Sequence, residues 1–426
     1  MESLLDTFLF LPRTLHPLTH AGLLLLLSYV GGRLANRLKA PRVIGYLVTG
    51  MLLSPSLSGI LSENLVWKEL NVVTHIALAV ISFSIGGSLE LGKVKRLGRQ
   101  ILWITITQGL GALLLATLAL SAFFIIFRCD GGLPPVFWTF FFPMAIVIGA
   151  ICAATAPAAT LAIVHEYRAQ GPLTSILLGV VALDDALTIL MYAVAVGLAR
   201  SLVGGEVPSL LEYLLKPGVS VFVSLAIGAA MGALIRLAAS RVAGRDAMLG
   251  ITMGALFVTA GLATSLKVHP LLGNMMTGFV VANFVRHQEN LFAVVEQIEE
   301  PIFGMFFALA GAHLDLELIQ SAGWLALVIS TGRFAGKILG SRLGAEISSA
   351  SPLVKKYLGY ALLPTAGVTV GLALEAQAAF GAGEFTRIMV GGVLGSVILN
   401  EILTPFVIRF SLFKAGEAFP KASEKA

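Results

Sequence analysis

A run from Ile101 to Phe127 that is apolar nearly all the way round is the feature that most limits how this chain can fold. The run holds no charged side chain, and a helix of roughly 20 apolar residues is long enough to cross the hydrocarbon core of a bilayer. A second run, Val219–Ile235, has the same character. Only 12% of the 426 residues are charged, against about 25% in an ordinary soluble domain. The sequence therefore predicts a helical membrane protein.

The apolar segments divide into about thirteen spans, which predicts an all-α polytopic membrane protein. We place the spans near residues 17–36, 42–61, 70–91, 100–127, 136–165, 172–203, 217–240, 247–266, 270–286, 299–314, 322–345, 354–380 and 385–412. With the N-terminus outside, most of the 29 lysines and arginines fall on the inner side, as cytosolic segments require. We therefore expect a multi-pass protein of a cell membrane with its C-terminus in the cytosol. The net charge of +5 then reflects this asymmetry, and no nucleic-acid partner is expected.

Two short motifs recur in the second half of the chain and indicate an internal repeat. Ile44–Gly50 in the second span resembles Leu272–Gly278 in the ninth, 228 residues later. Gly86–Leu91 at the end of the third span resembles Gly311–Leu316 at the end of the tenth, 225 residues later. Both pairs lie seven spans apart, so the second copy enters the membrane from the opposite face. Inverted repeats of this kind are common in secondary transporters.

The repeat also predicts a pair of interrupted helices. Pro157 interrupts the fifth span, and Pro364 with Thr365 interrupts the twelfth, again seven spans apart. A proline removes one backbone donor and clashes with the preceding turn. Free backbone groups at membrane depth persist only inside protein or beside a wet cavity. Each proline alone also fits an ordinary kink, but the symmetric pair favours discontinuous crossing helices whose ends face an ion site.

These features predict one membrane transporter domain made of two inverted six-helix repeats. Repeat one covers about 17–203, a linking helix about 217–240 and repeat two about 247–412, and a short cytosolic tail follows at 413–426. Cys129 and Cys152 make neither a disulfide framework nor a metal-ligand spacing. We expect no cofactor.

Asp184 and Asp185 stand side by side in the apolar sixth span. Placing one charged aspartate at the bilayer centre costs at least about 2.5 kcal/mol, so such residues normally mark an ion pathway or a proton relay. Neighbours point about 100° apart on a helix, so one can face a cavity while the other meets a partner. The alternative is a buried ion pair retained for packing or insertion.

The eleventh span supplies basic residues that can compensate these acids. Arg333 and Lys337 lie four residues apart on one helix face, and either can pair with Asp184 as its salt-bridge partner. Lys337 is the more interesting partner, because a buried lysine can release a proton. The alternative for Arg333 is a side chain that reaches the inner interface or lines a dimer seam.

The two aspartates predict exchange of a cation for protons. A carboxyl group removed from water favours its protonated form, whereas bound Na⁺ or Li⁺ favours the anion and expels the proton. If cation and proton exclude each other at Asp185, and only loaded states cross, exchange follows. Asp184, which shares a cation with Lys337, can carry a second proton and make the exchange electrogenic. We add Thr155 to these cation- and proton-binding residues. The only metal ion expected at Asp184 and Asp185 is the transported monovalent cation.

Other polar residues inside spans are expected to form hydrogen bonds with neighbouring helices. They are His75, Asn274, Asn283, Glu375, Asn400 and Glu401. The acidic residues Glu296, Glu299 and Glu300 are expected in a solvated loop or at a helix start, although a cytoplasmic funnel mouth or a pH-sensing role is equally open.

From about Ala21 to Glu417 the chain resembles the monovalent cation:proton antiporter superfamily, in particular its second branch of bacterial sodium/proton and potassium/proton exchangers. The tandem aspartate in its sixth-span setting is the most specific point of resemblance. The matching motifs are Gly45–Pro55, Gly86–Leu91, Asp184–Asp185, Gly336–Gly340, Pro364–Leu372 and Thr404–Glu417.

The resemblance implies a homodimer in which a mobile core domain moves like an elevator against a rigid dimerisation domain. By this analogy the core contains spans three to five and ten to twelve around the sixth and thirteenth. Asp185 matches the cation- and proton-binding carboxylate, Asp184 its salt-bridging neighbour, and Lys337 the basic partner of electrogenic members. The double aspartate therefore favours electrogenic exchange of Na⁺ or Li⁺.

Two departures from the family pattern leave ion selectivity open. Ala156 stands where many relatives carry an acid, and Thr365–Gly367 stands where some sodium exchangers carry a base and a carboxylate. Exchange of K⁺ for protons is the main alternative, followed by sodium-coupled symport of small organic anions. An intramembrane aspartyl protease needs Tyr-Asp and Gly-x-Gly-Asp settings, which the sequence lacks, and a channel suits paired broken helices less well. No enzymatic activity is expected.

Overall fold

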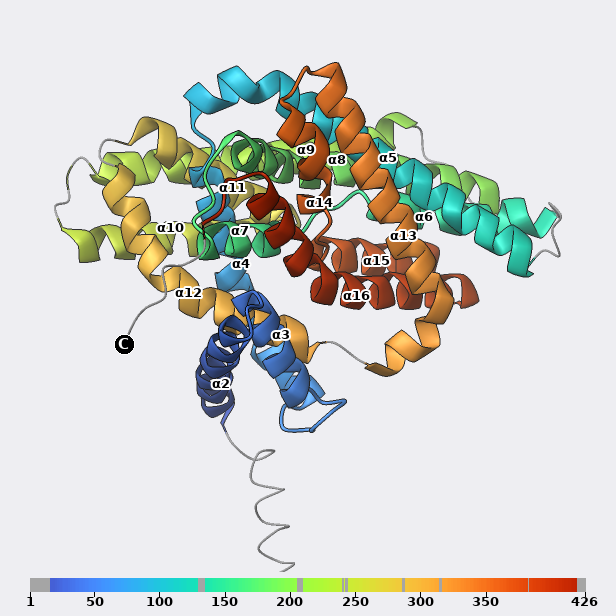
Figure 1. Cartoon of the computed structure of the whole chain (residues 1–426), viewed down its shortest axis with the longest axis horizontal. Helices are drawn as coiled ribbons and strands as arrows, with labels where there is room; N and C mark the ends of the chain where they lie inside the picture. The colour runs from blue at the N-terminus through green and yellow to red at the C-terminus, as the bar shows by residue number, and fades with distance from the viewer. Residues whose placement is uncertain are drawn as a thin grey trace, which may run out of the picture.

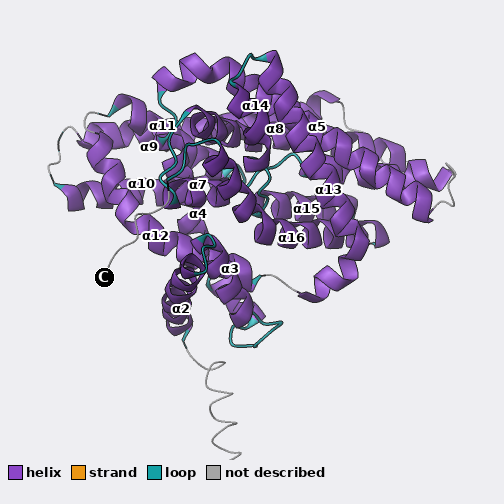
Figure 2. Ribbon diagram, viewed as in Figure 1, coloured by secondary structure: helices purple, strands orange, loops and turns teal. Residues whose placement is uncertain are grey.

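Helices are the only regular elements in the part of the chain that the structure describes (Figure 2). The structure is a computed structural model, and it describes residues 16–128, 135–204, 210–239, 241, 244–285, 288–313, 316–381 and 383–419. Six of these helices are long and apolar enough to cross a membrane, judged by length and composition. The all-α class predicted from the sequence is confirmed. Residues 420–426 of the predicted tail lie outside the described residues.

Seven helices pack against one another in a group that we name the scaffold bundle. They are α2 (Pro17–Arg37), α3 (Arg42–Leu53), α4 (Asn71–Gly87), α9 (Leu210–Ala239), α10 (Arg245–Ser265), α11 (Pro270–Phe284) and α12 (Gln288–Ala312). A π-helical turn, η1 (Leu65–Glu69), precedes α4. The main contacts join α11 to α4 and α9, and α12 to α3 and α2. In Figure 1, α2 and α3 lie at the bottom and α10 lies at the left.

The remaining helices form a second group, which we name the core bundle. They are α5 (Leu91–Arg128), η2 (Phe137–Phe141), α6 (Phe142–Ile151), α7 (Pro157–Glu166), α8 (Pro172–Val203), α13 (Leu316–Ile347), α14 (Pro352–Ala361), α15 (Gly367–Phe380) and α16 (Glu384–Lys414). The helices α5 and α13 run side by side at the right of Figure 1 and make the most extensive contact in the molecule's described part.

The third and tenth spans correspond to α4 and α12, which the family analogy assigns to the core. In the structure α4 packs mainly on α11, and α12 packs mainly on α3. Both helices therefore belong to the scaffold bundle, and this part of the predicted core composition is wrong. The reason lies in small residues along these helices, which let the four backbones approach closely.

Four glycines on α3, α4, α11 and α12 press against the backbone of a facing helix, where a Cβ would overlap it. The four contacts are Gly50 with Ala308, Gly278 with Phe83, Gly86 with Met275 and Gly311 with Leu47. Adding 228 to the number of Gly50 and subtracting 225 from that of Ala308 gives Gly278 and Phe83, which form the second contact. The same two shifts turn the contact of Leu47 with Gly311 into the contact of Met275 with Gly86. The close approaches thus recur at the two offsets of the sequence repeat.

Some helix ends differ from the predicted spans. The helix α3 stops at Leu53, well before the predicted end at residue 61, because Ser54 precedes Pro55 and is extended (φ −61°, ψ 157°). The helices α5 and α9 begin earlier than predicted. So does α12, which starts at Gln288 and therefore includes the acidic residues expected in a loop.

The fifth and twelfth spans are each two short helices joined by a non-helical stretch. The helix α6 ends at Ile151 and α7 begins at Pro157, and Ala156 between them is extended (φ −74°, ψ 109°), as a residue before proline prefers. Residues 362–366 separate α14 from α15 in the same way. The two stretches touch, since the Ala156 N–H donates to the Pro364 carbonyl at 2.9 Å. Carbonyls freed at these breaks need other donors.

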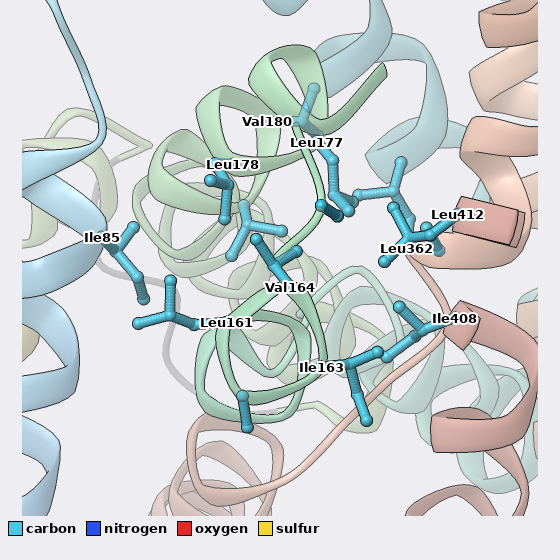
Figure 3. Packing of buried hydrophobic residues seen from close by; sticks show 14 of the residues in the cluster. Ile85, Leu161, Ile163, Val164, Leu177, Leu178, Val180, Leu362, Ile408 and Leu412 are labelled. Carbon is cyan, nitrogen blue, oxygen red and sulfur yellow. The ribbon is translucent and has the colours of Figure 1, made fainter. Parts of the chain in front are cut away.

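Buried apolar side chains hold α7 and the first turns of α8 in place (Figure 3). Leu161 of α7 and Leu177 of α8 are fully buried and lie in one cluster with Leu362, Ile408 and Leu412. Lipid tails are as apolar as leucine, so the hydrophobic effect does not hold helices together within a membrane. Close packing of their side chains does. This cluster fixes the position of the segment that leads to the two aspartates.

Candidate functional site

Asp184 of α8 and Lys337 of α13 form a fully buried ion pair. Both side chains are 0% exposed, and Lys337 Nζ lies 3.1 Å from Asp184 Oδ2. The helices α13 and α5 cross closely beside this pair. A Cβ on Gly340 of α13 would lie only 2.8 Å from Gln108 Cα of α5, so this position needs a glycine. Of the two bases predicted as partners of Asp184, the structure brings Lys337 to it.

Gln108 and Thr155 complete the surroundings of the pair. Gln108 Nε2 donates to Asp184 Oδ1 at 2.5 Å, and Gln108 Oε1 accepts from Lys337 Nζ at 2.7 Å. The Thr155 hydroxyl accepts from Lys337 Nζ at 2.6 Å and donates to Asp184. Lys337 also donates to the Ala153 carbonyl at 2.6 Å. We name these residues the Asp184 network; both of its charges have the additional hydrogen bonds that a buried ion pair needs.

Sequence reasoning missed Gln108. The available signal was a single amide side chain within the apolar run Ile101–Phe127. A buried amide needs hydrogen-bond partners, and the acids and bases of two other spans were the obvious ones.

Arg333 binds the backbone of both breaks and is not the direct partner of Asp184. Its side chain is 1% exposed. Its Nε donates to the Cys152 carbonyl at 3.1 Å, its Nη2 donates to Ala154 (2.6 Å) and Pro364 (2.9 Å), and its Nη1 donates to Leu363. These carbonyls follow the C-terminal ends of α6 and α14, where a helix carries partial negative charge. One guanidinium thus donates to the carbonyls at the ends of both half-helices. Arg333 therefore lies neither at the inner membrane interface nor on a dimer seam, the two alternatives considered from the sequence.

The three residues predicted at the breaks take different positions. Pro157 is the first residue of α7, where its fixed φ suits a helix and its missing N–H is no loss. Pro364 lies inside the second stretch and offers its carbonyl to Arg333. Thr365 stays within its own segment, with its hydroxyl 2.5 Å from that of Thr369.

Asp185 adjoins the Asp184 network but lacks partners of its own. Its side chain is 2% exposed, and within the described part of the chain neither carboxylate oxygen has a hydrogen-bond partner. An ionised carboxylate left unpaired away from water costs several kcal/mol. Asp185 is therefore suited to hold either a proton or a cation.

Asp185 borders a cavity of about 250 Å³ between the core and scaffold bundles. Burial lowers the pKa of His269, which precedes α11, and this disfavours a positive charge on its ring that would repel a cation. Glu375 of α15 adds a second carboxylate to the wall. The other lining residues are Ile189, Pro270, Leu271, Leu272, Val368, Gly371 and Leu372.

A second cavity, of about 170 Å³, lies between α3, α7 and α12. Glu299 in its wall is 4% exposed, accepts a hydrogen bond from Ser84, and lies 2.8 Å from His165 Nδ1. The neighbouring Glu300 pairs with Arg42. The expectation of a solvated loop or helix start is wrong for Glu299, because α12 begins earlier and buries it. The alternative position at a funnel mouth agrees with this cavity.

The C-terminal segment caps the helix that carries both aspartates. Glu417 accepts hydrogen bonds from the N–H groups of Leu173 and Thr174 at 2.7 Å each, and from the Thr174 hydroxyl at 2.7 Å. A carboxylate at this end satisfies free N–H groups and favours the helix dipole. Nothing in the sequence links Glu417 to this helix, so sequence reasoning missed it.

The remaining polar residues divide into two groups. Asn283 joins helix ends as predicted: it donates to the Leu89 carbonyl at 3.0 Å and accepts from Leu91 N–H at 2.6 Å. Among the described residues, the buried side-chain amide atoms of Asn274 and Asn400 have no hydrogen-bond partner, and neither does Glu401 Oε2. For Asn274 and Asn400 the expected bonds between helices are absent from the described part of the chain.

Broken crossing helices, buried bases at the breaks and an unpaired carboxylate on a cavity are features of a secondary transporter. The family described as "Sodium/hydrogen exchanger, transmembrane" matches residues 22–413, and the chain belongs to this family. It is a multi-pass membrane protein and a monovalent cation/proton antiporter, not an enzyme.

Relatives and solved structures agree with this assignment. The chain is 23% identical to the high-affinity Na⁺/H⁺ antiporter NhaS3 of Synechocystis sp., over 92% of this chain and 89% of the relative. It is also 23% identical to the K⁺/H⁺ antiporter subunit KhtU of Bacillus subtilis, over 96% and 94%. The structure of the sodium proton antiporter MjNhaP1 from Methanocaldococcus jannaschii matches with a TM-score of 0.71 and 17% identity, over 95% of this chain and 99% of that one. The last likeness supports the fold.

Proposed function

We propose that this antiporter exchanges Na⁺ or Li⁺ for protons and that Asp185 binds cation and proton in turn. The observation that carries the proposal is the buried carboxylate of Asp185, unpaired within the described chain and facing a cavity. A cation that enters this cavity meets two carboxylates, Asp185 and Glu375. Binding at Asp185 favours its anion and releases the proton, and the reverse exchange follows on the other side.

The Asp184 network supplies a second proton in this proposal. While Asp184 is paired, Lys337 keeps its proton because the carboxylate and three further acceptors stabilise the ammonium. A cation that draws Asp184 into its coordination removes that stabilisation, and the lysine releases its proton. Thr155 bonds to both partners and can turn its oxygen to the cation. Two protons then leave for each cation, which makes the exchange electrogenic.

Elevator-type movement of the core bundle against the scaffold bundle is the proposed route of alternating access. Both breaks and both aspartates lie in the core bundle. The glycine-lined crossings of α3, α4, α11 and α12 support a rigid scaffold. Two cavities between the bundles, one with Asp185 and one with Glu299, supply entrances. We place the protein in the bacterial inner membrane as a homodimer joined through its scaffold bundles, with the N-terminus outside and the C-terminus in the cytosol.

Exchange of K⁺ for protons is the alternative, which the likeness to KhtU supports. Sodium-coupled symport of organic anions is less suitable. The described lining of the Asp185 cavity contains two carboxylates and no lysine or arginine, so it repels an anion.

Transport by the purified full-length protein in liposomes tests the proposal. A dye inside the vesicles reports whether Na⁺, Li⁺ or K⁺ dissipates an imposed pH gradient. We expect Na⁺ and Li⁺ to act, and Asp185→Asn to abolish their effect. Glu384→Gln, which removes an exposed carboxylate at the start of α16, is the matched control and should transport normally.

The outcomes separate the alternatives. Rates that change when K⁺ and valinomycin clamp the membrane voltage support electrogenic exchange. Activity with K⁺ alone favours the K⁺/H⁺ alternative. If no cation acts between about pH 6 and 9, or if Asp185→Asn equals the wild type, the proposed site is wrong and organic-anion uptake is the next assay.

A further inference from the structure

Glu401 is a carboxylate within a membrane span, and the proposed transport mechanism does not use it. It lies within the long helix α16, four residues before Pro405. Its Oε2 is buried and, among the described residues, has no hydrogen-bond partner. The side chain borders a cavity of about 340 Å³, larger than the one at Asp185.

Among the described residues that line its cavity, no basic side chain compensates the charge of Glu401. The described residues that line its cavity include no lysine and no arginine, and their only other titratable member, His313, has its Nδ1 2.7 Å from the Leu309 carbonyl. Ionisable residues inside membrane spans are rare and are by default functional, because burying them is costly. Either a proton or a positive charge that enters with a ligand can compensate this carboxylate, as at Asp185.

The shape and lining of the cavity decide what kind of ligand fits. Its walls are mostly apolar, with a few polar groups, and its volume falls at the lower end of the roughly 300–1,000 Å³ typical of small-molecule sites. The apolar members are Phe306, Ala310, Ala366, Gly367, Val370, Leu394, Val397 and Ile398, and the polar ones besides Glu401 and His313 are Asn71 and Thr74. A bare metal cation needs several oxygens to replace its hydration shell, and this wall supplies few.

We propose that the Glu401 cavity binds an amphipathic organic ammonium ion. The ammonium group pairs with the Glu401 carboxylate, and the hydrocarbon part lies against Phe306 and the aliphatic side chains of α15 and α16. Such a ligand satisfies the buried carboxylate with a charge-assisted hydrogen bond and covers the apolar wall of the cavity.

The position of the cavity gives binding a consequence for transport. Gly367 and Val370 of α15 face this cavity, whereas Val368, Gly371 and Glu375 face the cavity of Asp185. One helix thus separates the two sites. The Glu401 cavity also joins α4 and α12 of the scaffold bundle to α15 and α16 of the core bundle. If the elevator movement proposed above is correct, an occupant that bridges both bundles slows transport without competing for Asp185.

Equilibrium binding of radiolabelled 4-phenylbutylamine to the full-length protein in detergent tests the site without requiring transport. We expect Glu401→Gln to weaken binding at least about tenfold, the effect of losing one hydrogen bond to a charged group. The neutral analogue 4-phenylbutanol should bind the wild type as weakly as the amine binds the variant. Glu375→Gln removes a carboxylate from the other side of α15 and should leave amine binding unchanged.

A second variant tests the cavity independently of its charge. Ala310→Leu adds bulk to the wall and should abolish binding of both the amine and the alcohol while the protein keeps its melting temperature. Equal amine binding by wild type and Glu401→Gln overturns the proposal, as does a loss that occurs in Glu375→Gln instead. In liposomes the amine should slow wild-type exchange without raising the half-saturating Na⁺ concentration. Binding with no inhibition keeps the site but argues against the elevator movement, so the two proposals fail separately.

Discussion

Asp184 and Asp185 are neighbours on one helix, yet their surroundings are opposite. Asp184 is paired with Lys337 and receives hydrogen bonds from Gln108 and Thr155. Asp185 is equally buried, but within the described chain both of its oxygens lack partners. The difference follows from helix geometry, because adjacent side chains point about 100° apart. One therefore meets α5, α13 and the first break, and the other meets a cavity.

One helix can thus hold a structural charge and a free charge side by side. Satisfying Asp184 of α8 requires groups from α5, α13 and the first break, so this aspartate ties the core bundle together. Asp185 contributes nothing comparable to folding, because an unpaired buried carboxylate destabilises its surroundings. The two regions should respond in opposite ways to the same substitutions.

The largest effect on stability is expected from breaking the Asp184–Lys337 pair. Either Lys337→Met or Asp184→Asn leaves a charge buried without its partner, and such losses cost about 3–5 kcal/mol. We expect a large drop in melting temperature in detergent for each variant. The double variant Asp184→Asn/Lys337→Met removes both charges and should melt well above either single variant. Additive losses would show that the pair is not the main interaction of these residues.

Arg333 should follow Lys337 in the size of its effect. Arg333→Met removes donors from four carbonyls at the two breaks and the positive charge at two helix C-termini. We expect a loss of about 2–3 kcal/mol, since each hydrogen bond contributes about 1 kcal/mol and the freed carbonyls can rearrange in part. Arg333→Lys keeps the charge but cannot reach four carbonyls, so it should recover only part of the melting temperature. Full recovery by lysine would mean that charge alone matters.

Two threonines at the two breaks offer a smaller and more selective test. Thr155 bonds to Lys337 and Asp184, whereas the Thr365 hydroxyl contacts only Thr369 among the described residues. Hydrogen bonds between helices in a membrane average about 0.6 kcal/mol, so we expect Thr155→Val to lower stability by about 1 kcal/mol. The half-saturating cation concentration should rise in Thr155→Val and remain near wild type in Thr365→Val. Equal shifts in both variants would place the cation between the breaks rather than beside Asp184.

Much of the fold could be predicted because its signals are local. Apolar runs mark the spans, and the prolines mark both breaks. The grouping of α4 and α12 with the scaffold could not be predicted, since it depends on which glycines face which backbones across the molecule.

The site was predictable in its charged residues and not in their pairing. Asp184, Asp185, Arg333 and Lys337 are conspicuous in apolar helices. Which base meets Asp184 depends on a shift of one helical turn along α13, and the sequence contains no record of that register. Gln108 acts through its position on α5 and not through any motif.

The smallest effect on stability is expected from Asp185→Asn. The same substitution at the preceding residue, Asp184→Asn, is expected to be among the most damaging. The change at Asp185 replaces an unpaired carboxylate with an uncharged amide of similar shape, so it removes a buried charge without breaking a bond. We expect the free energy of unfolding to change by less than about 1 kcal/mol or to rise, as when a buried uncompensated charge is neutralised. Cation-dependent proton release should be lost in the same preparation, measured by adding Na⁺ to weakly buffered protein. A melting temperature that falls as far as that of Asp184→Asn would contradict the comparison, because it would show that Asp185 also holds the core bundle together.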